Sequence, residues 1–217
     1  MIQVSELHFT TDDGIKVLED VYLHIDRGEL VYLIGDASAG KSLLLSLLAA
    51  HVPPQQGQIL VNGRNVARLG REKALRLRRQ VGLLPQGFVP STRPVLGNLT
   101  FKLRVLGDFR EQAEEKALAT LELVGLLRHQ RTEAAELSAA ERLRLGIALS
   151  ICDDPLLLLI DDLFDGLGPE DQDQICSLLD RVNERGLTIL ATARGPLPAR
   201  TAQRRVLELS DGRVIAP

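Results

Sequence analysis

The fold of this chain is decided by eight consecutive residues, Gly35-Asp36-Ala37-Ser38-Ala39-Gly40-Lys41-Ser42. They fit the pattern G-x-x-x-x-G-K-[ST], in which the backbone N–H groups of the loop surround phosphate oxygens. The apolar run before them, Leu30–Ile34, is typical of a buried strand, and the run Leu43–Leu48 after them is typical of a helix. A loop that ends where a helix begins points N–H groups and the positive end of the helix dipole at an anion. The sequence therefore predicts a phosphate-binding loop between a strand and a helix.

The last two residues of this loop indicate a nucleotide and a magnesium ion as its ligands. Lys41 would reach the β- and γ-phosphates, and the Ser42 hydroxyl would ligate Mg²⁺. An ordinary tight turn between a strand and a helix also uses glycine, but it does not explain why lysine and serine follow Gly40. We expect nine residues to contact the nucleotide here: Gly35, Asp36, Ala37, Ser38, Ala39, Gly40, Lys41, Ser42 and Leu43.

The composition suits one α/β unit that carries a subdomain. The chain has 217 residues, of which 45% are hydrophobic and 25% charged. Its formal net charge is -3, and no dense run of lysine and arginine indicates a nucleic-acid surface. Cys152 and Cys176 are isolated, without metal-binding spacing, which fits a reducing cytosol. Because the sequence shows neither a signal peptide nor an apolar run of membrane-spanning length, we expect a cytoplasmic protein held at the inner face of the plasma membrane by a partner.

The hydrophobic pattern alternates between strands and helices, with a helical stretch in the middle. Apolar residues at helical spacing over Glu111–Leu126 indicate that the chain from about Pro90 to Ser150 is a helical insertion. The runs that we interpret as strands are Leu7–Phe9, Val21–Ile25, Ile59–Val61, Val81–Leu84, Leu156–Ile160 and Leu187–Leu190, followed by a hairpin of Val206–Leu209 and Val214–Ile215.

An acidic pair follows one of these strands. Leu157–Ile160 runs directly into Asp161 and Asp162, as expected of a central strand that ends at the crevice where open α/β sheets bind ligands. We expect Asp161 to hold Mg²⁺ through water and Asp162 to lie beside the attacking water. A solvated acidic turn would have the same composition, but the phosphate loop upstream favours the magnesium interpretation.

With these elements in place, the chain resembles ABC-type ATPase subunits, most closely the cell-division FtsE group with its LolD- and MacB-like relatives. Gln86 matches the glutamine of the Q-loop, and residues 93–107 resemble the segment that opens the helical subdomain. Leu137–Arg144 occupies the position of the signature L-S-G-G-E-Q-Q-R, and Arg194 falls where the family has its switch histidine.

The resemblance implies an ABC-type P-loop NTPase with an N-terminal antiparallel β-subdomain, a RecA-like parallel-sheet core and an inserted helical subdomain. Residues 1–217 would form one ATP-binding domain, with 1–89 and 151–217 as β-subdomain and core and 90–150 as helical subdomain. It implies ATP and Mg²⁺ as cofactors and a second subunit that faces the signature. The site residues carried over are Asp162, Gln86 and Arg194 for catalysis, Ser42, Gln86 and Asp161 for Mg²⁺, and Ser138, Ala139, Ala140 and Glu141 for the ATP of the facing subunit.

The departures from the family pattern concern hydrolysis more than binding. Asp162 replaces a glutamate and is one methylene shorter, while Arg194 is donor-only where the family has histidine. We therefore expect slow or partner-dependent turnover. The remaining departures are Thr11 in place of the aromatic that stacks on adenine, Ser38 in place of a loop glycine, Ala139 and Ala140 in place of the signature glycines, and Gly168 in place of an aspartate.

The function implied by the resemblance is that of an ATP-binding subunit in an FtsE-like membrane complex, in cell division, regulation of cell-wall hydrolases or transport. It would couple ATP–Mg²⁺ binding and slow hydrolysis to an integral membrane partner, either FtsX-like or a permease. A homodimer is expected ahead of a heterodimer with a consensus ABC subunit. Two alternatives stay open. One is a catalytically dead ATP-binding scaffold paired with a permease. The other is a soluble P-loop kinase, which would not need Gln86 and a signature-like turn, or a DNA-associated ABC protein, which would usually carry a long coiled-coil insertion and a basic face.

Overall fold

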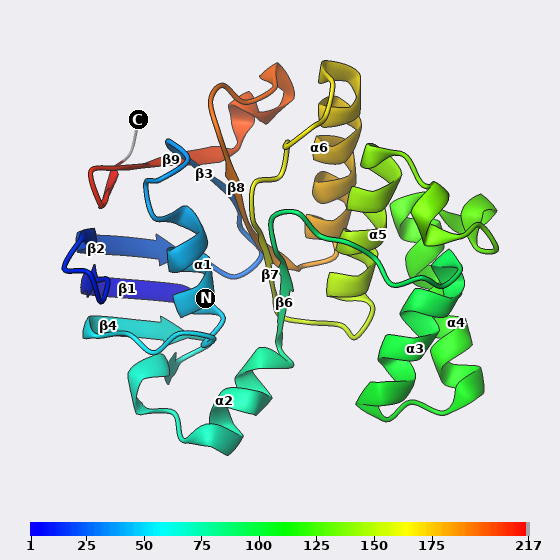
Figure 1. The fold of residues 1–217 in the computed structure, drawn as a ribbon, viewed down its shortest axis with the longest axis horizontal. Helices are drawn as coiled ribbons and strands as arrows, with labels where there is room; N and C mark the ends of the chain where they lie inside the picture. The colour runs from blue at the N-terminus through cyan, green and yellow to red at the C-terminus, as the bar shows by residue number, and fades with distance from the viewer. Residues whose placement is uncertain (216–217) are drawn as a thin grey trace.

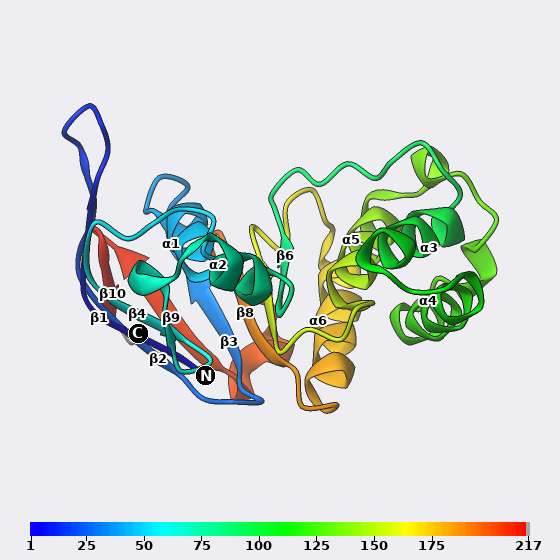
Figure 2. The same cartoon turned by 90° about the horizontal axis from the view of Figure 1, so that it is seen from below.

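Two β-sheets enclose the helix that follows the phosphate loop. In this computed structural model, which describes residues 1–215, an antiparallel sheet faces a mainly parallel one (Figures 1 and 2). The antiparallel sheet has the order β2 (Lys16–Ile25), β1 (Ile2–Thr10), β4 (Gln56–Val61) and β5 (Arg64–Asn65). Helix α1 (Lys41–Leu48) buries four leucines, Leu44, Leu45, Leu47 and Leu48, in a core shared with strands of both sheets.

The second sheet carries the site on its carboxyl edge. Its order is β10 (Arg213–Ile215), β9 (Arg205–Ser210), β3 (Leu30–Ile34), β8 (Thr188–Ala193), β7 (Leu157–Ile160) and β6 (Val81–Leu84). The strands from β9 to β6 are parallel, and β10 closes the edge as an antiparallel hairpin. Because parallel strands end at one edge, the loops after β3, β6, β7 and β8 lie together there.

The helical part of the chain packs beside β6 and β7 (Figure 1). Helices α3 (Val95–Leu106), α4 (Arg110–Val124) and α5 (Ala139–Ile151) pack on one another, and α6 (Pro169–Asn183) joins them to the sheet through a shared apolar core. Helix α2 (Arg71–Arg78) lies before β6. Gly82 in β6 permits the close approach of α5, because an added Cβ would stand 2.1 Å from the carbonyl oxygen of Ser150. This arrangement confirms the predicted fold class.

The predicted elements are confirmed in kind and mostly corrected in length. Strand β6 runs over Val81–Leu84 as predicted, and the hairpin is present. Strands β1 and β2 are longer than predicted, because their exposed polar residues alternate with buried ones and break the apolar run. The helix predicted over Glu111–Leu126 ends at Val124, since Gly125 adopts a φ of 77°. The proposed division at residues 90 and 150 stays a prediction, and residues 216–217 lie outside the described chain.

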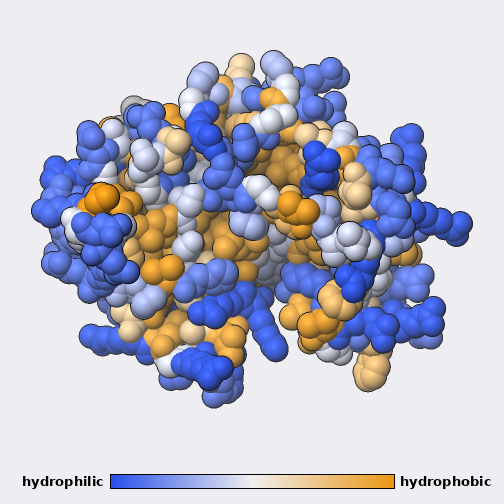
Figure 3. All heavy atoms as spheres, in the orientation of Figure 1, coloured by the Kyte–Doolittle hydropathy of each residue, from blue (hydrophilic) through white to orange (hydrophobic). Residues whose placement is uncertain are grey.

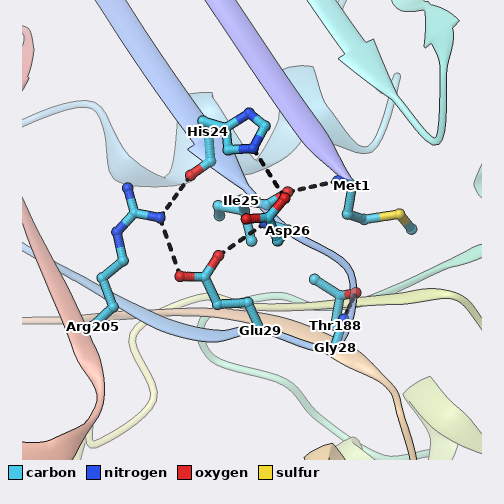
Figure 4. Close-up of polar contacts among 8 residues, drawn as sticks. All are labelled: Met1, His24, Ile25, Asp26, Gly28, Glu29, Thr188 and Arg205. Carbon is cyan, nitrogen blue, oxygen red and sulfur yellow. Dashed lines mark hydrogen bonds and ion pairs between the residues drawn. The ribbon is translucent and has the colours of Figure 1, made fainter.

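Polar contacts connect the two sheets at the end far from the phosphate loop (Figure 4). Glu29 accepts hydrogen bonds from Arg205 (3.1 Å) and from the backbone N–H of Asp26 (2.8 Å). The N–H of Gly28 donates to Thr188 Oγ1 at 3.0 Å. The loop before β3 is therefore attached to both strands that flank β3.

None of the helices within residues 1–215 has the length and apolarity needed to cross a bilayer.

Candidate nucleotide-binding and catalytic site

The phosphate loop is shaped by two glycines that lie against neighbouring strands. Gly40 has a φ of 99°, and an added Cβ would stand 2.9 Å from Val17 Cγ1. At Gly35 an added Cβ would stand 2.3 Å from the carbonyl oxygen of Leu209. Both positions therefore require glycine. Ser38 is not among the residues with positive φ, so its replacement of the usual glycine causes no backbone strain of that kind.

Helix α1 begins directly at the end of this loop, and its first turn is free of competing side chains. Gly40 is its N-cap, no side chain caps it, and no acidic residue occupies the first turn. Four N–H groups at a helix start lack partners within the helix, which makes this end suited to an anion. Ser42 is exposed in the same turn.

Lys41 is almost completely buried and folds back onto the loop that precedes it. Its Nζ donates to the carbonyl oxygens of Gly35 (2.5 Å) and Asp36 (2.7 Å), and the residue is only 5% exposed. Burial lowers the pKa of its ammonium group, while the carboxylate of Asp162 opposes this shift. The lysine is thus positioned at the loop mouth by main-chain oxygens that a phosphate could replace.

The acidic pair lies at the end of β7 and is oriented by a threonine of β8. The Thr192 hydroxyl donates to Asp161 Oδ1 (2.9 Å) and accepts from the N–H of Asp162 (2.8 Å). The N–H of Asp161 donates to the carbonyl oxygen of Leu84 (2.9 Å), which joins this turn to the end of β6. The sequence analysis did not identify Thr192, because the predicted strand ended at Leu190 and the burial of this hydroxyl appears only in the structure.

Gln86, Asp162 and Arg194 meet, although 76 and 32 positions separate them from one another along the chain. Gln86 Nε2 donates to Asp162 Oδ2 at 2.9 Å, and the Arg194 guanidinium pairs with the same oxygen. The Asp162 side chain is 7% exposed and that of Arg194 is 45% exposed. Burial raises the pKa of Asp162, while Arg194 is the main cause that opposes the shift. Asp162 also adopts a φ of 54°, so its backbone is held in the left-handed region.

The chemistry of the predicted magnesium ligands fits Mg²⁺, which prefers oxygen donors from few protein groups together with phosphate and water. Ser42 offers a hydroxyl and Asp161 a carboxylate, whereas Gln86 uses its amide nitrogen on Asp162 and keeps its oxygen for another partner. Within residues 1–215 no three His, Cys, Asp or Glu side chains gather as a dedicated metal cluster.

The signature-like segment forms the start of α5. The Ser138 Oγ accepts from the N–H of Glu141 (3.3 Å), and Glu141 Oε2 accepts from the N–H of Ser138 (2.8 Å). These hydrogen bonds lower the pKa of Glu141, and His129 Nε2 lies 3.2 Å from its other oxygen. Ala139 is exposed, while Ala140 is buried beneath it. Glu141 is therefore occupied as the partner of a helix cap.

Within one chain this segment and the phosphate loop do not meet. Figures 1 and 2 show α5 and α1 on opposite sides of the parallel strands. Thr11, at the position of the family's adenine-stacking aromatic, forms the turn of the β1–β2 hairpin, where its N–H and hydroxyl bond to Ile15. Phe9 is half-buried against the core. Thr11 therefore offers a hydroxyl, already bonded within the turn, where the family has an aromatic ring.

Three comparisons place this site among known proteins. The family model described as ABC transporter matches residues 18–165. The methionine import ATP-binding protein MetN of Carboxydothermus hydrogenoformans is 34% identical over 99% of the chain, which spans 64% of that protein. The cell division ATP-binding protein FtsE of Streptococcus pneumoniae is 30% identical over 99% of the chain and 94% of its own length. A solved dimeric bacterial ABC transporter cassette has a TM-score of 0.85 and 25% identity, and covers 99% of this chain and 96% of its own.

FtsE and MetN match at similar identity, so the predicted FtsE-like character is not singled out. The broader assignment stands, because the family model spans the phosphate loop, Gln86 and the Asp161–Asp162 pair in one alignment. This chain belongs to the ABC transporter family and is one of its ATPases.

Proposed function

We propose that this chain is the ATP-binding subunit of an FtsE-like ABC membrane complex and transmits ATP–Mg²⁺ binding, with slow hydrolysis, to an integral membrane partner. The observation that carries the proposal is the carboxyl edge of the parallel sheet. There Lys41, the start of α1 and Asp161 stand where a triphosphate and its metal would bind. The division into a core (1–89 and 151–217) and a helical subdomain (90–150) belongs to the same proposal.

In this proposal each side chain at the site has a defined task. Lys41 exchanges its carbonyl partners for phosphate oxygens, and the N–H groups of α1 bind the same anion. Bound magnesium would neutralise phosphate charge, held by Ser42, Asp161 and the oxygen of Gln86. Asp162 orients the attacking water. Its side chain is one methylene shorter than that of a glutamate, so its carboxylate extends less far. A misplacement of ~1 Å can cost ~10²-fold in rate, which is why slow turnover is expected.

The site is completed by a second subunit. Ser138, Ala139, Ala140 and Glu141 would present the start of α5 to a nucleotide held by the facing chain. The dimeric relative with 25% identity supports this arrangement. In a homodimer both sites combine Asp162 with the Ala139–Ala140 pair. In a heterodimer with a subunit that has the usual family residues, each site would have those residues on one of its two sides.

The surface proposed for the membrane partner is a groove beside Gln86. It has a volume of about 520 Å³ and lies between α2 and the helices α3 and α5. Apolar side chains line it, including Leu75, Phe88 and Leu106, with Arg79 and Lys102 at its margin. Figure 3 shows this hollow at the lower edge, with apolar side chains gathered on both sides. Because Lys102 is already paired with Asp153 in this lining (2.6 Å), the apolar side chains are what a partner would contact, and the segment that fits is a short amphipathic helix.

The experiment is co-purification with integral membrane proteins encoded nearby, with ATPase activity measured with and without them. A photo-crosslinker on a cysteine at Val105, exposed on α3, should label the partner, while one at Gln203 should not. The native Cys152 and Cys176 are buried and do not compete for the reagent. A native complex whose membrane contacts avoid the groove would overturn this part of the proposal.

A catalytically dead scaffold is the second candidate, and one observation favours it. The carboxylate of Asp162 is already paired with Arg194 and bonded to Gln86. If phosphate release stays absent when the partner is present, while ATP still binds, the scaffold is the correct function.

A further inference from the structure

One segment of the chain, residues 64–79, is far more basic than the rest of the molecule. It contains seven of the 26 lysine and arginine residues but only one of the 29 aspartate and glutamate residues, in a chain whose formal net charge is -3. The cations do not form an unbroken run, because other residues separate most of them: Arg64, Arg68, Arg71, Lys73, Arg76, Arg78 and Arg79. We call residues 64–79 the basic segment.

The fold brings the basic segment to the surface at one edge of the molecule. The segment covers β5, the short 3₁₀ turn Val66–Arg68 and α2, which form the lower edge of the view in Figure 1. Leu77 is the only residue that α2 buries, so most of this helix faces solvent. Arg64 is half-buried, and the other six cations are exposed. A short helix held by one leucine therefore presents its charges outward.

Most of these cations have no partner within the chain. Glu72 pairs with Arg76, and the Arg78 guanidinium donates to the carbonyl oxygen of Ala50 from Nε (3.0 Å) and Nη2 (2.7 Å). Within residues 1–215, no ion pair or side-chain hydrogen bond occupies the other five, which are Arg64, Arg68, Arg71, Lys73 and Arg79. Gathered like charges repel one another, so an external anionic surface is attracted to this edge.

The basic segment borders the groove proposed for the membrane partner. Leu75 and Arg79 line that groove. Arg68, Arg71 and Lys73 lie outside its lining. Along the helix, Leu75 lies one turn from Arg71 and one turn from Arg79, and it is 49% exposed. Arginines on both sides of a half-exposed leucine suit the headgroup level of a membrane, where both the charges and the apolar side chain are stabilised.

We propose that the basic segment binds the headgroups of anionic phospholipids directly, so that the chain makes its own electrostatic contact with the membrane beside its partner. This goes beyond the proposed function, in which the partner alone attaches the chain, and only the orientation of the segment toward the bilayer rests on that function. Headgroups fit better than the carboxylates of one partner helix, because four of the five unpaired cations lie outside the groove lining. Headgroups also fit better than a nucleic acid, because residues 64–79 contain no aromatic side chain that could stack on bases.

The test is co-sedimentation of the purified full chain with lipid vesicles, without nucleotide or partner. Phosphatidylcholine vesicles with about 30% phosphatidylglycerol should bind the chain at about 50 mM salt, and about 0.5 M salt should release it, because salt screens the attraction. Vesicles of phosphatidylcholine alone should not bind it. Each lysine or arginine at an anionic surface contributes roughly five-fold in affinity, so the triple variant Arg68→Gln, Arg71→Gln, Lys73→Gln should bind about 10²-fold more weakly.

The matched control removes three exposed cations from other parts of the surface, Arg128→Gln, Arg131→Gln and Arg185→Gln, and so has the same net charge as the first variant. It should bind the anionic vesicles like the wild type. Equal losses in the two triple variants would mean that net charge alone matters and would overturn the proposal. Equal sedimentation of the wild type with both kinds of vesicle, or with neither, would overturn it without any variant.

Two other results would assign the basic segment to a different partner. If the wild type ignores anionic vesicles but the first triple variant no longer co-purifies with the membrane partner, the segment binds carboxylates of that protein and the lipid proposal is wrong. If a short DNA duplex binds more tightly than the anionic vesicles and displaces the chain from them, the partner is a nucleic acid. ATP–Mg²⁺ binding, measured separately by calorimetry, keeps the two proposals distinct. Its absence contradicts the nucleotide function, whereas its presence without vesicle binding contradicts only this inference.

Discussion

The phosphate loop and the Asp162–Arg194 corner share one edge of the sheet but are built in opposite ways. The loop consists of consecutive residues whose path is fixed by glycine and by contacts with Val17 and Leu209. The corner joins Gln86, Asp162 and Arg194 from three separate loops through side-chain hydrogen bonds. The first depends on backbone shape and the second on side-chain length and charge. We therefore expect substitutions of Asp162 to affect hydrolysis more than nucleotide binding.

The largest effect is expected from removing the ammonium group of Lys41, the cation of the phosphate loop. Lys41→Ala should abolish ATP–Mg²⁺ binding measured by calorimetry, because no other side chain of the loop supplies a charge-assisted donor to phosphate. Lys73→Ala, an exposed lysine on α2, is the control and should bind normally. If the wild-type chain does not bind ATP at millimolar concentration, alone or with its partner, the central interpretation is wrong.

The role of the Asp162–Arg194 corner in hydrolysis can be tested by restoring the residues that the family usually has there. Asp162→Glu extends the carboxylate, and Arg194→His removes the permanent charge that occupies it. We expect Asp162→Glu alone to act weakly, and the double change to raise phosphate release by up to ~10²-fold, more than the two single effects combined. Steady-state phosphate release from purified dimers with the partner is the measurement. A wild-type rate that is already efficient and unchanged by these substitutions would show that the corner works as it stands.

A smaller effect is expected at the start of α5. Ala139→Gly and Ala140→Gly should raise turnover a further few-fold in the double variant, by reopening the approach of the backbone to the facing phosphate. Glycine in the first helical turn also costs up to ~1 kcal/mol of stability relative to alanine, so thermal unfolding should be recorded alongside. A fall in unfolding temperature without a gain in turnover would mean that the methyl groups do not hinder the facing subunit.

The smallest effect is expected from Glu141, whose role in capping α5 can be tested by stability measurements that do not involve a nucleotide. The pKa of Glu141 is lowered by its hydrogen bonds with Ser138, so the native state is stabilised above its ordinary pKa of 4.5. This stabilisation disappears as the pH falls through the lower, folded value. Glu141→Gln should therefore cost up to ~1 kcal/mol at pH 7 and almost nothing in acid, measured by denaturant unfolding. An equal cost at both pH values would argue against the ionised cap.

The sequence predicted the phosphate loop better than it predicted the contacts of the Asp162–Arg194 corner. The loop, the acidic pair and the parallel strands are local patterns, and each was recognisable because its residues are neighbours in the chain. Strands β1 and β2 were predicted too short, because alternating polar residues interrupt the apolar run that marks a buried strand. The pairing of Arg194 with Asp162 and the support from Thr192 depend on which strands lie side by side. No local pattern carries that information.

Few residues along the chain separate the groove from the catalytic site. Leu84 lines the groove, and its carbonyl oxygen accepts the N–H of Asp161, while Gln86, two residues later, holds Asp162. Beyond Gln86 the chain is anchored again at Ser91 by the buried Asn98. Between these two anchors, Phe88 packs against the apolar core beside α5. Under the proposed function, a partner segment bound in the groove would therefore lie beside the strand end whose carbonyl oxygen and following glutamine orient Asp161 and Asp162.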